Sequence, residues 1–354
     1  AQQAPLPLIS QRVRPSACQP ASTNNAAVRE LSTPPDSPTA TRCSPGLARW
    51  LGSGGLATLQ LIWGWGLWQL WRRRGRRCAG WLISLLLAHA VGALSLSPPP
   101  AFAALRLGAW QPAIPTREKF SPDRQRRFNA ALSSALQQAQ ALQVQALVAP
   151  EGTLPSRWQP DDVDGLPLPL ISGGFRWVRG QLRSSVLLGL PGRAGLEPLV
   201  DKHRLVPLGE WLPPLPAGLT RGLSAVGGLQ PGNASRYAEA WPSPSAIAIC
   251  YEISHGWALA QASAQGAEWL LTIANLDPYP QLLQRQFLAL AQLRAIETGR
   301  DVLSVANTGP TALVSADGSV QQLLEAGSEA VAVTDLQLRS QLTGYARLVS
   351  GWSW

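Results

Sequence analysis

Three segments of the sequence each place a reactive side chain next to a short apolar stretch. Glu151 follows Leu-Val-Ala-Pro, Lys202 lies in a run of charges that starts at Asp201, and Cys250 follows Ala-Ile-Ala-Ile. A carboxylate at a pocket mouth can act as a general base, an ammonium can stabilise an oxyanion, and a thiolate is a nucleophile. Each residue alone also fits an ordinary place, as a capping Glu, a solvated Lys or a buried Cys. The three together are more specific, because a nucleophilic Cys needs a nearby base or cation.

Cysteine and histidine usage narrows the possible chemistry. Cys250 is the only cysteine after residue 104, so a disulfide framework is excluded for that part of the chain. The other three cysteines precede it: Cys18, Cys43 and Cys78. His203 and His255 are the only histidines after residue 104, and neither fits a Cys-His-Asn arrangement, which disfavours a papain-like mechanism. One Cys and two scattered His have no ligand spacing for zinc, so we expect neither a metal nor another cofactor.

The elements that must carry these residues follow an alternating order from about Leu105 onward. Leu105–Gln111 alternates as a strand does, Pro122–Val144 has the apolar period of an amphipathic helix, and a short buried strand at 145–149 leads to Glu151. Further strands are predicted at 170–174, 185–190, 246–250, 269–274, 302–306, 312–315 and 330–334, and helices at 254–265 and 281–298. Alternating strands and helices predict an α/β layered domain at 105–348, followed by a short tail at 349–354.

The first 104 residues predict a different kind of structure. Residues 1–46 are rich in Pro, Ser, Thr and Gln and are predicted to be disordered, whereas residues 47–104 are predicted to form a membrane anchor. Two apolar runs, at about 51–71 and 79–97, are each long enough for a helix to cross a hydrocarbon core of roughly 30 Å. The arginine-rich loop 72–77 between them belongs on the cytoplasmic side. We therefore expect the following domain on the non-cytoplasmic, periplasmic side of the cell membrane.

Two alternatives to this topology stay open. The first apolar run contains Gln and Gly, so it can lie at the membrane interface instead of spanning. Alternatively, the arginines and the second run form a secretory signal with a cleavage site at 101–103. The domain lies outside the cytoplasm in every case.

The charge distribution argues against a nucleic-acid partner. The chain has a formal net charge of +9, a balance that often indicates nucleic-acid binding. However, the first 104 residues contain ten Arg and no Lys against Glu30 and Asp36, whereas the remainder has 20 basic and 19 acidic residues. A nearly neutral domain behind a basic leader indicates membrane topology rather than nucleic-acid binding.

In their order along the chain and in their residues, the three reactive segments resemble those of the nitrilase superfamily, whose members use a Glu, a Lys and a Cys in that order. Within it they look like the apolipoprotein N-acyltransferases. The motifs that carry this resemblance are Asp-Lys-His-Arg-Leu-Val-Pro-Leu-Gly-Glu-Trp-Leu-Pro at 201–213, Ile-Cys-Tyr-Glu at 249–252, Gln-Leu-Arg-Ala-Ile-Glu-Thr-Gly-Arg at 292–300, Ala-Asn-Thr-Gly at 306–309 and Gly-Tyr-Ala-Arg at 344–347. The resemblance covers about residues 105–347. It implies a four-layer α-β-β-α sandwich, here preceded by one or two transmembrane helices.

By position, the resemblance implies that Cys250 is the nucleophile, Glu151 the base and Lys202 the oxyanion stabiliser. It also matches three supporting residues: Glu210, Glu252 and Tyr251. The implied reaction is ping-pong, with an acyl chain passing from a phospholipid to a Cys thioester and then to the α-amine of a diacylglyceryl-cysteine lipoprotein. The implied partners are therefore a phospholipid donor, a lipoprotein acceptor and the membrane, and the sequence indicates no oligomeric state.

The chain departs from this family pattern in its membrane region, in the loop at 275–280 and at Ser184, where the family commonly has Asn, which keeps a second function open. The family precedes the domain with six or more membrane helices, where two spans at most are expected here, and the loop at 275–280 is shortened. The alternative is a membrane-anchored or exported C–N (amide) hydrolase, in which water replaces the amine. The Glu210 loop and the motif at 345–347 favour the transferase, and the reduced helix bundle favours the hydrolase. The intact Glu-Lys-Cys set disfavours a non-catalytic interaction protein.

Overall fold

A computed structural model of the chain describes residues 45–73, 78–115, 122–155, 157–163, 165–212, 228–239, 241–277 and 279–351. Most of the predicted leader at 1–46, residues 74–77 of the predicted basic loop and residues 352–354 of the predicted tail lie outside the described residues. The sites discussed below all lie within them.

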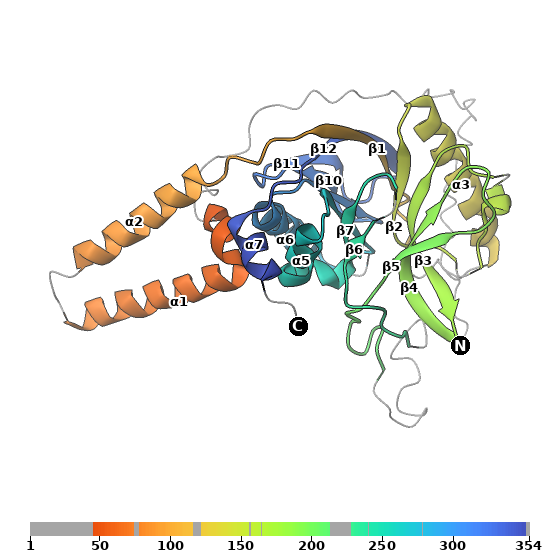
Figure 1. Ribbon diagram of the computed structural model, residues 1–354. Coiled ribbons are helices and arrows are strands. Elements are labelled where there is room, and N and C mark those ends of the chain that lie inside the picture. Colours follow the sequence, from red (N-terminus) through yellow and green to blue (C-terminus); the bar gives the residue numbers. More distant parts are fainter. Residues whose placement is uncertain are drawn as a thin grey trace, which may run out of the picture. The chain divides into compact units, whose positions relative to one another are not determined.

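Two six-stranded sheets form the centre of the domain (Figure 1). The first has the order β12-β1-β2-β3-β4-β5, in which β1, β2 and β3 run parallel to one another. Its strands are β1 Ala103–Gln111, β2 Ala146–Leu154, β3 Leu170–Val178, β4 Gln181–Gly189, β5 Glu197–Asp201 and β12 Ala330–Leu338. The second has the order β11-β10-β9-β8-β7-β6, in which β7, β8 and β9 run parallel. Its strands are β6 Tyr237–Ala238, β7 Ser245–Ile249, β8 Trp269–Ala274, β9 Val302–Ala306, β10 Thr311–Val314 and β11 Val320–Leu324.

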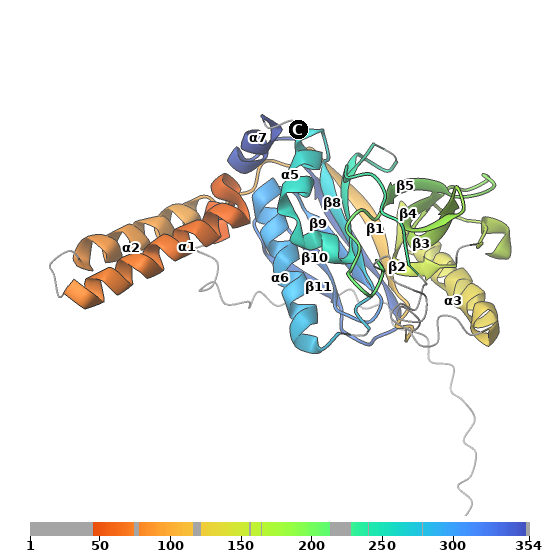
Figure 2. The same cartoon turned by 90° about the horizontal axis from the view of Figure 1, so that it is seen from below.

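Helices cover the outer face of each sheet (Figure 2). The α-helices are α1 Ala48–Arg73, α2 Cys78–Leu94, α3 Pro122–Ala141, α5 Gly256–Ala264, α6 Gln281–Thr298 and α7 Gly344–Ser350. The short 3-10 helices are η2 Pro45–Leu47, η4 Pro160–Val163 and η5 Cys250–Ser254. Apolar residues of α3, such as Leu132 and Leu136, pack on the first sheet, and those of α5 and α6, such as Leu259 and Ala295, pack on the second.

The inner faces of the two sheets pack against each other and form the main core. Val148 and Val186 of the first sheet share this core with Ile247, Ile273 and Val305 of the second. β7 and β8 are buried along their whole length, as near-continuous apolar parallel strands are when both faces are covered. The four-layer α-β-β-α architecture expected from the sequence is therefore confirmed.

The N-terminal helices α1 and α2 correspond to the two predicted membrane spans, but α1 is interrupted and α2 is shorter than predicted. In the described part of the chain, no helix is both long enough and apolar enough to cross a membrane. The helix α2 has 17 residues and ends at Leu94 rather than near residue 97, and α1 is interrupted at Gly52, whose φ of 66° and ψ of 178° are not helical. The spans at about 51–71 and 79–97 are not confirmed by these helices and stay a prediction.

Candidate active site

Glu151 lies inside β2 rather than after it. The sequence predicted a strand end at residue 149, because Pro150 and Gly152 usually stop a strand. Instead, β2 continues to Leu154, and its register against β3 shifts between Ala149 and Leu154. Gly173 of β3 makes this arrangement possible, since a Cβ there would lie 2.5 Å from the Cα of Glu151. The missing side chain lets the two strands approach closely where Glu151 is presented.

Lys202 follows β5 directly and is 1% exposed. Its backbone is held on both sides, because its N–H donates to the carbonyl of Ser184 and its carbonyl accepts from the N–H of Gly232, each at 2.8 Å. The ammonium Nζ donates to Oε1 of Glu151 at 2.8 Å and to Oε1 of Glu210 at 2.6 Å. The second oxygen of Glu210 accepts from the Val206 N–H at 2.9 Å, which closes the loop that brings Glu210 back to Lys202. The structure therefore brings Glu151, Lys202 and Glu210 together.

Cys250 is presented at a sharp turn between β7 and η5. The sequence predicted it as the last residue of a strand, whereas the strand ends at Ile249 and Cys250 opens the 3-10 helix. Its φ of 53° lies in the left-handed region, which a residue other than glycine adopts only at an energetic cost. The Cys250 thiol and Glu151 interact through a side-chain hydrogen bond. A strained turn of this kind is typical of a residue held for function.

Glu151, Lys202, Glu210 and Cys250 form one buried cluster, and its electrostatics determine which of these groups carries a proton before the reaction begins. Burial raises the pKa of the Cys250 thiol well above its usual range, Glu151 adds to the rise, and Lys202 opposes it. Burial alone would lower the pKa of Lys202, but Glu151, Cys250 and Glu210 raise it above its ordinary value. The resting cluster therefore contains a neutral thiol beside a charged ammonium, and the thiol has to lose its proton during the reaction.

Two asparagines complete the surroundings of Glu151. Its second carboxylate oxygen accepts from the Asn275 N–H at 3.1 Å. The Asn275 side chain accepts from Nδ2 of Asn307 at 2.8 Å, and Asn307 exchanges two further hydrogen bonds with the backbone of Ile114. The sequence contained a signal for both, since each directly follows a buried parallel strand, as Cys250 follows β7. Polar residues at the carboxyl ends of neighbouring parallel strands converge on one edge of a sheet.

The remaining predicted site residues lie around this cluster. Glu252 is buried and pairs with Arg236 instead of with Lys202. Tyr251 is 47% exposed, so it belongs to the surface beside the cluster. Tyr279, which the sequence showed only as part of a shortened loop, stacks on Phe287 with a ring distance of 6.4 Å. Burial raises the pKa of Tyr279. Cys250, Glu151 and Glu210 raise this pKa further and Lys202 opposes the rise, so the ring lies within their electrostatic reach.

The chain is similar in sequence to known proteins. Residues 178–343 match the family described as carbon-nitrogen hydrolase, a stretch that includes Lys202 and Cys250. The chain is similar to the apolipoprotein N-acyltransferase of Parasynechococcus marenigrum, with 85% identity over 308 residues, 87% of this chain and 66% of that protein. The apolipoprotein N-acyltransferase of Prochlorococcus marinus is 57% identical over 315 residues, 86% of this chain and 62% of that protein.

These matches cover only part of each relative. The chain spans just under two thirds of the length of these two relatives. Among solved structures, an amidase from Nesterenkonia sp. is 16% identical, with a TM-score of 0.47, and the match covers 70% of this chain and 94% of the amidase. A likeness at that level carries no argument about activity.

Proposed function

We propose that the chain acts as an apolipoprotein N-acyltransferase, which moves an acyl chain from a phospholipid through a Cys250 thioester to the N-terminal amine of a diacylglyceryl-cysteine lipoprotein. The observation that carries this proposal is the buried array of Glu151, Lys202 and Cys250, in which the base contacts both the nucleophile and the ammonium. The similarity to the N-acyltransferases over 87% of the chain supports the choice of acceptor.

The first half-reaction forms the thioester. Glu151 takes the thiol proton as the Cys250 sulfur attacks the ester carbonyl carbon of the phospholipid, so that a C–S bond forms. Two of the three ammonium N–H groups of Lys202 are taken by Glu151 and Glu210, and the third is directed to the developing oxyanion together with a backbone N–H near Tyr251. The intermediate collapses, the C–O bond breaks, and the lysophospholipid leaves with the proton that Glu151 held.

The second half-reaction uses the same groups in the same order. The acceptor amine attacks the thioester carbonyl, and Glu151 takes a proton from the nitrogen as the C–N bond forms. The C–S bond then breaks, and the proton returns to the Cys250 sulfur. In this scheme Glu210 keeps the Lys202 ammonium in place in both steps, because it accepts a hydrogen bond from Nζ at 2.6 Å.

We further propose that the α1–α2 hairpin contacts lipid and that the catalytic domain works on the non-cytoplasmic side of the cell membrane. Many large apolar side chains of this hairpin are exposed: Leu61, Ile62, Trp65, Leu67, Trp68, Trp71, Leu82, Ile83, Leu86, Leu87, Val91 and Leu94. An apolar surface of this extent needs a lipid or protein partner. The arginines at 72–77, which include the last two residues of α1, favour the cytoplasmic side for this part of the chain.

A carbon–nitrogen hydrolase is the second candidate, favoured by the family match at residues 178–343. In that reaction Cys250 attacks an amide carbon, an amine leaves, and water replaces the amine acceptor in the second step. The same Glu151 and Lys202 would serve, so the cluster itself does not separate the two functions. The acceptor does.

A product assay separates them. The chain is incubated with vesicles of mixed glycerophospholipids and a diacylglyceryl-cysteine peptide, and the products are identified by mass spectrometry. The proposal expects N-acylated peptide and lysophospholipid in equal amounts, and neither with Cys250→Ser. Release of free fatty acid without N-acylated peptide, or hydrolysis of simple amides at a higher rate, would favour the hydrolase instead.

A further inference from the structure

Arg236 lies directly before β6, in a segment without any group of the proposed chemistry. It is 3% exposed, and all five of its guanidinium N–H groups have an acceptor. Nη1 donates to both carboxylate oxygens of Glu252, at 2.8 Å each. Nη2 donates to the carbonyls of Asp201, at 3.0 Å, and of Asn233, and Nε donates to that of Ala234 at 3.3 Å.

Glu252 extends this connection to the backbone on both sides of the candidate active site. Its Oε1 accepts from the N–H groups of His203, at 2.8 Å, and Arg204, at 3.1 Å. Its Oε2 accepts from the N–H of Ile249 at 3.0 Å. His203 directly follows Lys202, and Ile249 directly precedes Cys250. The Arg236–Glu252 pair therefore holds the lysine loop (residues 202–204) and the cysteine turn (residues 249–250) at a fixed separation.

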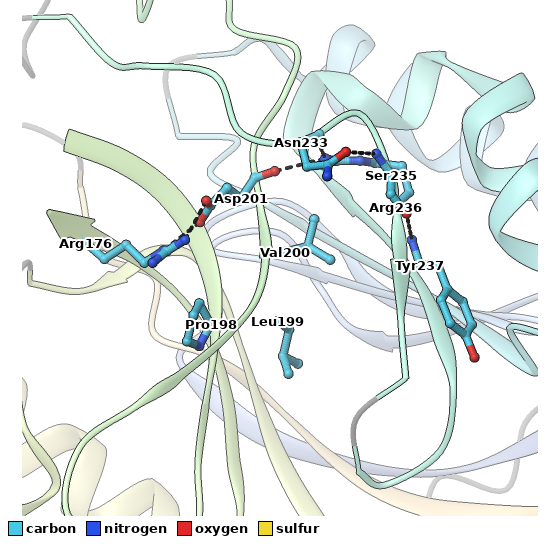
Figure 3. Close-up of a pocket in the computed structure, with 9 residues that line it drawn as sticks. All are labelled: Arg176, Pro198, Leu199, Val200, Asp201, Asn233, Ser235, Arg236 and Tyr237. Atoms are coloured by element: carbon cyan, nitrogen blue, oxygen red, sulfur yellow. Dashed lines mark hydrogen bonds and ion pairs between the residues drawn. The ribbon is translucent and has the colours of Figure 1, made fainter. Parts of the chain in front are cut away.

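Arg236 also lines a small surface pocket, together with residues that precede Lys202. Figure 3 shows Arg236 beside Asp201 and Asn233 in this pocket, which has a volume of about 220 Å³. Because each guanidinium N–H of Arg236 has its acceptor among Glu252 and backbone carbonyls, none remains for a substrate atom. Arg236 therefore acts on the chemistry only through the backbone that it holds.

We propose that Arg236 is a positioning residue for acyl transfer, which sets the Lys202 ammonium and the Cys250 thiol at their working separation. This inference rests on the proposed function. The planar guanidinium fork of Arg236 bridges a carboxylate and three backbone carbonyls at once, which the single ammonium of a lysine cannot do. A displacement of a reacting group by about 1 Å can cost on the order of 100-fold in rate.

Arg236→Lys tests this proposal, because it keeps the charge and loses the fork. The matched control is Arg300→Lys, since Arg300 is also buried but donates only to the backbone carbonyls of residues 267, 299, 340 and 341. Both variants are expected to unfold at a lower temperature than the wild type. At a temperature where all are folded, Arg236→Lys should lower kcat on the order of 100-fold with little change in KM, and Arg300→Lys should keep kcat.

A second readout does not depend on acyl transfer. The alkylation rate of Cys250 by iodoacetamide is followed against pH in a chain whose other cysteines are replaced by serine. Since Lys202 lowers the pKa of the Cys250 thiol, a displaced Lys202 should shift the profile of Arg236→Lys to higher pH. Glu252→Gln, which loses the charge pair but keeps the shape, should show the same shift and serves if Arg236→Lys does not fold.

The outcomes are distinguishable. A wild-type kcat and an unchanged alkylation profile in both variants would overturn the inference. If the wild type itself transfers no acyl chain, the proposed function fails, and the alkylation profile alone then decides whether Arg236 positions Lys202 against Cys250.

Discussion

Lys202→Met is the perturbation whose consequences the structure defines most fully. The ammonium of Lys202 is completely buried and contacts Glu151 and Glu210, and methionine keeps the apolar stem while removing the charge. Loss of one oxyanion donor costs about 3 kcal/mol of transition-state stabilisation, so kcat should fall by roughly 10²–10³-fold. Removing one partner of a buried ion pair costs about 3–5 kcal/mol of folding free energy, because the carboxylates stay buried without a cation.

The assay must separate these two effects. We expect the acyl-transfer kcat of Lys202→Met to fall by the stated factor at a temperature where urea titration shows the variant fully folded. The control is Arg193→Met, which removes only an exposed pair with Glu197 and should change neither quantity measurably. A folded Lys202→Met variant whose kcat lies within fivefold of the wild type would refute the assignment of Lys202 to the oxyanion.

Three further predictions concern the surroundings of the cluster. Gly173→Ala should lower kcat strongly, since its Cβ would lie 2.5 Å from the Cα of Glu151; steady-state kinetics checks this, and full activity would contradict it. Two arginines hold the pKa of Asp201 at about 2 although burial raises it, so its stabilising contribution is present above pH 3.8 and is lost as pH falls towards 2; acid titrations of the wild type and Asp201→Asn should diverge above that window and converge below it. Glu297→Ala leaves Arg294 buried without its counter-charge and should cost about 3–5 kcal/mol of folding free energy in urea, and a loss below 1 kcal/mol would contradict the pairing.

The parts of the fold that the sequence predicted are those with strong local patterns. The strands at 269–274 and 302–306 and the helix at 281–298 have the predicted bounds, because each is a clear apolar run or periodic segment. The sequence did not indicate β5, β6, β11 or α7. β5 is a short edge strand that contains Pro198, and α7 has only seven residues and depends on the Thr343 cap and on packing against neighbouring helices.

The candidate site was predicted only in part, for a related reason. Glu151 and Cys250 each follow a short apolar run and Lys202 lies in a run of charges, so the sequence marks all three, although it predicts the end of a strand before Glu151 where β2 continues to Leu154. The partner of Glu252 could not be read in this way, because Arg236 comes from a segment without any periodicity and meets Glu252 only in the folded chain. The hydrogen bond between Asn275 and Asn307 joins residues 32 positions apart, and the sequence signalled it only through the place of each residue directly after a strand.

The most direct test of the account is intact mass spectrometry of the purified chain after incubation with phospholipid vesicles, alongside Cys250→Ser. We expect a fatty-acyl mass increment on the wild type, absent from the variant, which a diacylglyceryl-cysteine peptide then removes. A folded wild type that shows no increment while its Cys250 still reacts with iodoacetamide would contradict acyl transfer through this cysteine.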